Sequence, residues 1–175
     1  RMSDTRVVPQ SRPISSLPML FSSQLVVSCT GCLLACWVWV LRPHDWGARM
    51  FGMTGLMFPV FAMPAAVYSC RELALPGNLF FALNTLNHWG SSMFGAALGA
   101  IFLAYPQPLV RPVHMVWLFV VFTLWWLTDV LRLAPSPGVG MQLAVITEML
   151  LAMVFAAIQW RRSRDEPLHR ASLRW

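Results

Sequence analysis

Five stretches of this chain are apolar, almost free of charge, and long enough to cross a lipid bilayer. An α-helix needs about 20 apolar residues to span the hydrocarbon core. Together the stretches contain two acidic residues and no arginine or lysine, and they cover residues 21–41, 50–70, 79–105, 113–131 and 141–160. Because backbone groups in hydrocarbon must hydrogen-bond within the protein, each stretch is predicted to be a helix. The predicted fold is all-α, a polytopic membrane helix bundle with about five transmembrane helices.

The composition agrees with a membrane protein. Hydrophobic residues make up 57% of the 175 and charged residues 11%, too few charges for the surface of a soluble domain. The formal net charge of +6 could suit nucleic acid, but five arginines lie in residues 161–175, directly after an apolar stretch. Such a cluster is typical of membrane orientation and anionic headgroups. We therefore expect membrane lipids as partners and no nucleic acid.

The charges between the stretches predict domain limits and topology. Residues 1–18 read as an extended lead-in, 19–162 as the transmembrane bundle, and 163–175 as a basic cytoplasmic linker. Positive-inside counting predicts a multi-pass protein with its C-terminus in the cytoplasm, because the inner segments hold Arg42, Arg49, Arg111 and the tail arginines, whereas the outer loops hold only Arg71 and Arg132. The three arginines of residues 1–18 would then lie outside and argue the other way, but they are distant from the first apolar stretch and so count for less. The start at Arg1 and the basic tail suggest a piece of a longer protein.

The third stretch carries polar and small residues inside its apolar run. At 3.6 residues per turn these fall on one side of a helix, and they are Asn84, Asn87, His88, Ser91, Gly95 and Gly99. The four-residue spacing of Ser91, Gly95 and Gly99 predicts a helix-packing contact, since small residues let backbones approach closely. The same face either serves packing alone or also binds a ligand.

Two acidic residues inside the predicted spans, Asp129 and Glu148, point to a site. An acidic group at membrane depth costs at least about 2.5 kcal/mol, so it faces the bundle interior and has a partner or a function. Depth along the helices places His88 and Glu148 at similar levels, roughly 13 and 10 Å from one membrane surface. We predict a ligand-binding layer made of Asn84, Asn87, His88, Ser91, Asp129 and Glu148.

Both acidic residues also have simpler explanations. Glu148 could simply join two helices through a hydrogen bond, without binding a ligand. Asp129 could form an i,i+3 pair with Arg132 at the membrane surface.

Catalytic and cofactor signatures are absent from the sequence. It has no glycine-rich phosphate loop, no G-x-S-x-G and no H-E-x-x-H, so no catalytic residue is predicted and an enzyme activity would require a domain outside this chain. A bis-histidine haem is not expected, because only His88 lies deep in a span while His44, His114 and His169 lie toward one side. Cys29, Cys32 and Cys36 share a helix face, but metal sites draw ligands from several elements. No cofactor and no metal are expected.

Several features together resemble the membrane sensor region of multi-span bacterial sensor histidine kinases of the competence and quorum-sensing kind. They are the Arg42-Pro43-x-x-Trp46-Gly47-x-Arg49 turn, the third span with Asn84, Asn87 and His88, the Tyr105-Pro106-x-Pro108-Leu109 exit, and the basic tail after Trp160. The resemblance implies a sensory region in a bacterial inner membrane that binds a lipophilic or amphipathic signal between helices, followed by a cytoplasmic kinase domain after Trp175. The alternative is a structural or assembly subunit of a larger membrane protein complex. For either function, a homodimer or a larger membrane complex is an expected assembly.

Overall fold

Five α-helices make up the described part of the protein in a computed structural model. The structure describes residues 19–70, 73, 75–133 and 136–163. The helices are α1 (Met19–Leu41), α2 (Trp46–Ser69), α3 (Gly77–Ala104), α4 (Pro112–Val130) and α5 (Pro137–Arg162). The lead-in predicted for 1–18, and the linker predicted for 163–175 apart from Ser163, lie outside the described residues. The all-α prediction is confirmed, with one helix for each apolar stretch.

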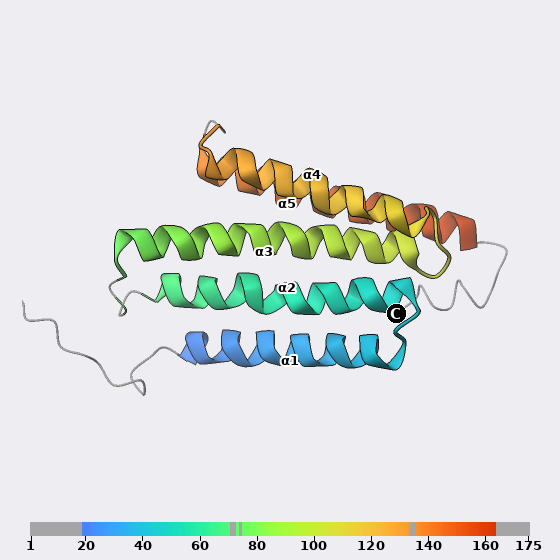
Figure 1. The fold of residues 1–175 in the computed structure, drawn as a ribbon, viewed down its shortest axis with the longest axis horizontal. Coiled ribbons are helices and arrows are strands. Elements are labelled where there is room, and N and C mark those ends of the chain that lie inside the picture. The colour runs from blue at the N-terminus through green and yellow to red at the C-terminus, as the bar shows by residue number, and fades with distance from the viewer. Residues whose placement is uncertain (1–18, 71–72, 74, 134–135, 164–175) are drawn as a thin grey trace, which may run out of the picture.

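The helices lie side by side in an open arrangement with α3 at its centre. In Figure 1, α1, α2 and α3 form one layer, and α4 and α5 cover α3 on the side away from α2. α3 packs against α2, α4 and α5, whereas the main contacts of α1 are with α2. Eleven residues of α3 are buried, and five of them are alanine or glycine at positions 95–100. Their small side chains let the neighbouring helices come close to α3.

Four of the five helices, α1, α2, α4 and α5, are long and apolar enough to cross a membrane. α3 is the longest, with 28 residues, but it is not among the four. Its glycines and polar side chains make it less apolar, and many of these groups are buried against the other helices. The protein is therefore a membrane protein in which α3, alongside the spanning helices in Figure 1, is sheltered by its neighbours.

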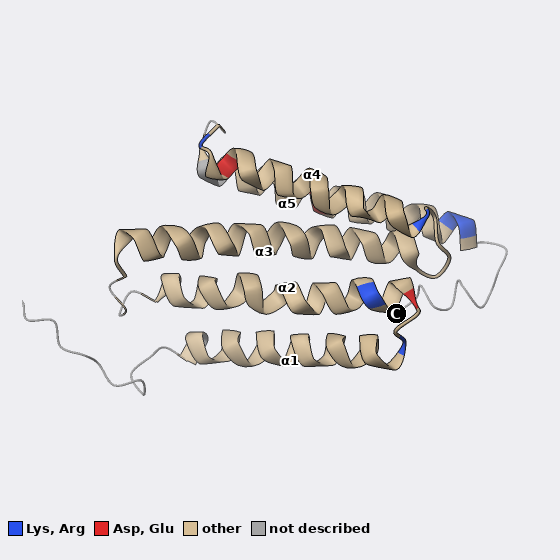
Figure 2. Ribbon diagram, in the orientation of Figure 1, with Lys and Arg blue, Asp and Glu red and all other residues tan. Residues whose placement is uncertain are grey.

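Apart from Glu148 in the middle of α5, the described charged residues lie at the two ends of the bundle. In Figure 2 the described arginines gather mostly at one end, here called the basic end, which holds Arg42, Arg49, Arg111, Arg161 and Arg162. The opposite end, here called the far end, carries Asp129 and Arg132. The chain passes through the bundle from one end to the other with each helix.

The turn between α1 and α2 is shorter than predicted, because α2 already begins at Trp46 with Asp45 as its N-cap. The Asp45 Oδ1 atom accepts hydrogen bonds from the backbone N–H groups of Gly47 at 2.7 Å and Ala48 at 3.4 Å, which caps the helix. Arg49 donates from Nε to the carbonyl of Pro43 at 2.6 Å and stacks over the Trp46 ring at 4.7 Å. The turn that contributes to the kinase resemblance thus has a local structural role.

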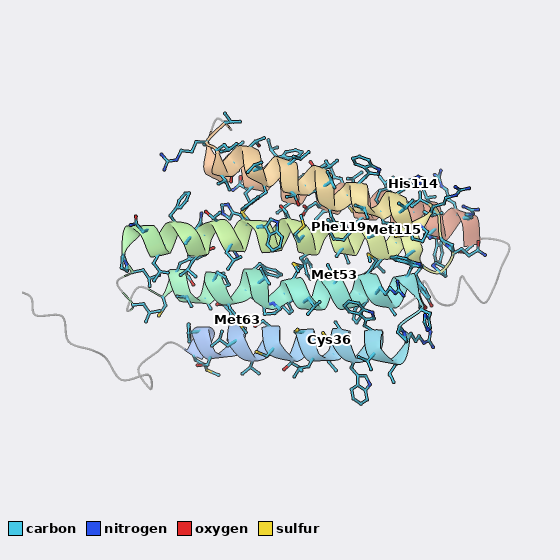
Figure 3. All side chains as sticks on the ribbon, in the orientation of Figure 1. Cys36, Met53, Met63, His114, Met115 and Phe119 are labelled. Atoms are coloured by element: carbon cyan, nitrogen blue, oxygen red, sulfur yellow. The ribbon has the colours of Figure 1, made fainter. Side chains whose placement is uncertain are left out.

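The layer between α3 and α4 is filled by apolar side chains. Met93, Ala96 and Phe122 form one buried cluster, and Leu103, Ala104 and Met115 form another. Figure 3 shows Met115 and Phe119 on the side of α4 that faces α3. This packing fixes α4 against α3 and so positions the polar groups at the far end.

Candidate functional site

A pocket of about 330 Å³ lies between α3 and α4 at the far end. Its amide and ionisable side chains are Asn84 and His88 from α3, Asp129 from α4, and Arg132 just after α4. Its remaining lining is Phe81, Thr85, Trp126 and Val130. Three of the predicted site residues, Asn84, His88 and Asp129, are therefore brought together.

The His88 and Asp129 side chains contact each other across α3 and α4, and this contact is an ion pair when His88 is protonated. The Nδ1 atom of His88 lies 3.4 Å from Oδ2 of Asp129, and the two side chains are only 15% and 9% exposed. The other carboxylate oxygen of Asp129, Oδ1, is buried and has no hydrogen-bond partner among the described residues. Asp129 is thus paired between helices, whereas the simpler explanation had placed its partner, Arg132, on the same helix.

Arg132 has an unusual backbone conformation at the edge of the pocket. Its φ angle is 57°, the left-handed region. The N–H of Leu133 donates to the carbonyl of Thr128 at 2.9 Å, and the N–H of Arg132 to that of Asp129 at 3.0 Å, which is the Schellman pattern that usually has glycine at this position. An arginine pays roughly 1 kcal/mol for this conformation. Such strain often marks functional residues, and here it accompanies a pocket-lining side chain.

An apolar groove adjoins the polar pocket. It encloses about 500 Å³ and is lined by Phe81, Ala82, Thr85, Leu86, Trp89 and Trp126. Phe81, Thr85 and Trp126 also line the polar pocket. The indole Nε1 of Trp126 donates to the carbonyl of Thr85 at 3.1 Å, which fixes the ring between the two spaces. Because Phe81 and Leu86 are exposed, the groove opens on the apolar outer surface of the bundle.

Glu148 points toward α3, as predicted, but it lies outside this pocket. The side chain is 3% exposed, it hydrogen-bonds to Ser92, and its carboxyl group occupies the space where a methyl group on Gly95 would lie. Glu148 therefore faces α3 one to two turns beyond His88. The depth calculation was wrong because it started α3 and α5 at one level, whereas α3 extends past the beginning of α5 at the far end (Figure 1).

Asn87 faces α2 and not the pocket. Its Nδ2 group donates to the carbonyl of Phe61 at 2.7 Å, and its Oδ1 atom accepts from the hydroxyl of Tyr68 at 3.1 Å. Neighbouring helix positions differ by about 100°, so Asn87 and His88 point toward different helices. Asn87 joins α2 to α3 and is separated from the other predicted ligand residues.

The predicted packing motif is only partly responsible for close helix contact. Gly95 lies against the side chain of Glu148 of α5. Gly99 is buried, but an added Cβ would lie 3.8 Å from Phe155 and 3.9 Å from Leu118, which are ordinary contact distances. Ser91 is half-buried, and its neighbour Ser92 is the serine that bonds Glu148.

Among the glycines of α3, Gly90 is the one that lies against the α2 backbone, and the sequence analysis did not select it. An added Cβ there would lie 2.8 Å from the backbone nitrogen of Phe61. Gly90 follows Asn87 by three residues, so both lie on the side of α3 that faces α2. The three-residue spacing from Asn87 was the sequence signal that could have identified Gly90 as a packing residue.

Three residues near the site were also not predicted as site residues, namely Ser92, Trp126 and Arg132. Ser92 was one of two adjacent serines, and only the packing of α5 distinguishes them. Trp126 and Arg132 resembled ordinary residues of a membrane surface, where aromatic and basic residues are common.

The chain matches no protein-family model, no curated protein and no solved structure.

Proposed function

We propose that this chain is a membrane-embedded signal-input region that binds a small amphipathic molecule between α3 and α4. The observation that carries the proposal is the union of a polar pocket with an apolar groove. The two spaces share Phe81, Thr85 and Trp126. Their volumes, about 330 and 500 Å³, are in the range of small-molecule sites.

The chemistry of the two spaces suits the two parts of such a molecule. Asp129 offers a buried acceptor oxygen, and the Asn84 amide and Arg132 guanidinium offer donors at the same pocket. The groove beside Trp89 and Trp126 offers apolar surface to a hydrocarbon chain. The head group would lie in the pocket and the chain would pass Trp126 into the groove.

The proposed orientation places the far end outside the cell and the basic end in the cytoplasm of a bacterial inner membrane. Of the described arginines, five lie at the basic end and Arg132 alone lies at the far end, which favours this orientation. The signal would then reach the pocket from the outer leaflet, and the C-terminus would lead into the cytoplasm. A histidine kinase domain there is proposed from the sequence resemblance alone.

Photo-crosslinking of matched amphiphiles tests the binding site. The protein in lipid nanodiscs would be treated with dodecyl chains that carry a diazirine and end in a hydroxyl, an amine or a carboxylate. We expect at least one probe to label the 81–89 segment of α3 or Trp126. Asp129→Asn and Asn84→Leu should each reduce that labelling at least threefold, because they alter the head-group pocket and leave the groove unchanged.

Asp45→Asn is the matched control. Asp45 lines a separate pocket at the basic end, and asparagine keeps the helix-capping function. Its labelling at α3 should equal that of the unmodified protein. Labelling spread evenly along all exposed helices, and unaffected by Asp129→Asn, would instead favour the alternative of a structural or assembly subunit.

A further inference from the structure

A second, much smaller cavity lies behind the pocket, among α3, α4 and the start of α5. Its volume is about 10 Å³, near the minimum of ~10–15 Å³ that holds one water molecule. Its polar lining comes from His88, Ser92 and Asp129, and its remaining walls are Trp125, Trp126, Gly140, Met141 and Ala144. A buried water needs two to four polar partners, and this cavity provides three polar side chains.

Two carboxyl groups are connected to this cavity, Asp129 as part of its lining and Glu148 through Ser92, and each has an unsatisfied acceptor atom. Asp129 Oδ1 and Glu148 Oε1 are both buried without a hydrogen-bond partner among the described residues. An acceptor left unsatisfied in this way costs about 1–3 kcal/mol. Ser92 lines the cavity and hydrogen-bonds to Glu148, so it connects the cavity to the second carboxyl group.

We propose that this cavity holds a water molecule, and that this water and the Ser92 hydroxyl form a hydrogen-bonded path from the open pocket to Glu148. Asp129 and His88 form the outer part of the path, because both line the open pocket and the small cavity. Glu148 is then a proton-binding site inside the membrane that exchanges its proton with water at the far end. This inference is independent of any amphipathic ligand.

The groups around Glu148 fit such a site. From α3 it meets Ser92 and Gly95, neither of which carries a charge. The nearest ionisable groups that the path includes are His88 of α3 and Asp129 of α4, and they are paired with each other. α5 itself has its arginines, Arg161 and Arg162, in its last turn. Among the described residues, the path through the cavity and Ser92 therefore connects Glu148 to the open pocket.

Water-edited ¹³C NMR of the protein in lipid bilayers tests the path. The chain contains three glutamates and four aspartates, so carboxyl labelling of these residue types gives few signals, and Glu148→Gln and Asp129→Asn assign two of them. We expect rapid magnetisation transfer from water to both carboxyl carbons, and a Glu148 signal whose chemical shift changes with pH. Absence of transfer to Glu148, or a shift that stays constant with pH, would overturn the proposal.

Two pairs of variants locate the path. Ala144→Val fills the cavity and should reduce transfer to Glu148 at least threefold, whereas Ala152→Val, at a buried alanine of α5 outside the cavity lining, should not. Ser92→Ala should reduce transfer to Glu148, and Ser91→Ala should not. Asp129 should keep its signal throughout, because it also contacts the open pocket. If valine prevents folding, the serine pair decides, and equal transfer in both serine variants would overturn the path.

Discussion

Gly95→Ala should destabilise the protein, whereas Gly99→Ala should not. Replacing glycine by alanine within a helix usually stabilises it by roughly 0.5–1 kcal/mol. At Gly99 the new methyl group would meet Phe155 and Leu118 at ordinary contact distances, so this gain should remain. At Gly95 the methyl group would overlap the carboxyl group of Glu148 and lie 3.0 Å from its Cβ atom.

The loss in the free energy of unfolding can be estimated from the rearrangement that the new methyl group would force on the Glu148 side chain. Its carboxyl end could rotate, but the side chain is 3% exposed and bonded to Ser92, so rotation breaks that bond and requires space in a packed layer. A lost hydrogen bond costs about 1 kcal/mol and overpacking about 1–3 kcal/mol. After the helix-propensity gain, Gly95→Ala should lower the free energy of unfolding by about 1–3 kcal/mol, and Gly99→Ala should raise it by up to about 1 kcal/mol.

Reversible unfolding in mixed micelles, followed by circular dichroism, measures both values. A double-mutant cycle isolates the cause, because Glu148→Ala removes the carboxyl group that the methyl group would meet. Gly95→Ala should cost less in that background, with a coupling of about 1 kcal/mol or more. Equal stability of the Gly95 and Gly99 variants, or additive effects in the cycle, would refute the proposed overlap.

Three further outcomes can be measured in the same unfolding assay. Gly90→Ala should be more harmful than Gly95→Ala, because the new methyl group would meet backbone atoms of α2, which cannot rotate away; a smaller loss at Gly90 would contradict this. Asn87→Leu should cost about 1–3 kcal/mol through its two lost bonds to α2, while Asn84→Leu in the open pocket should change stability by less than about 0.5 kcal/mol. Arg132→Gly should stabilise the protein by about 1 kcal/mol by relieving its left-handed backbone, yet weaken labelling by the carboxylate probe; unchanged stability would argue against the strain.

The sequence determined the number, order and approximate limits of the helices. Bilayer-length apolar stretches allow little besides helix, and prolines and charges interrupt them at each turn. It also determined that Glu148 faces α3, because a carboxyl group at that depth requires a polar neighbour. The convergence of Asn84, His88 and Asp129 could be predicted for a related reason, since all three are polar groups near one end of neighbouring helices.

Only the tertiary structure decided the register and the partners. Depth along separate helices does not reveal how far α3 extends past α5, so Glu148 was expected beside His88 and is found against Ser92 and Gly95. The polar and small residues of α3 also span a wide arc of the helix surface. Because α2 packs on one side of α3 and α4 and α5 pack on the other, these residues contact different helices. Asn87 thereby joins two helices, while His88, the next residue in the chain, lines the pocket, because a helix turns by about 100° between neighbouring positions.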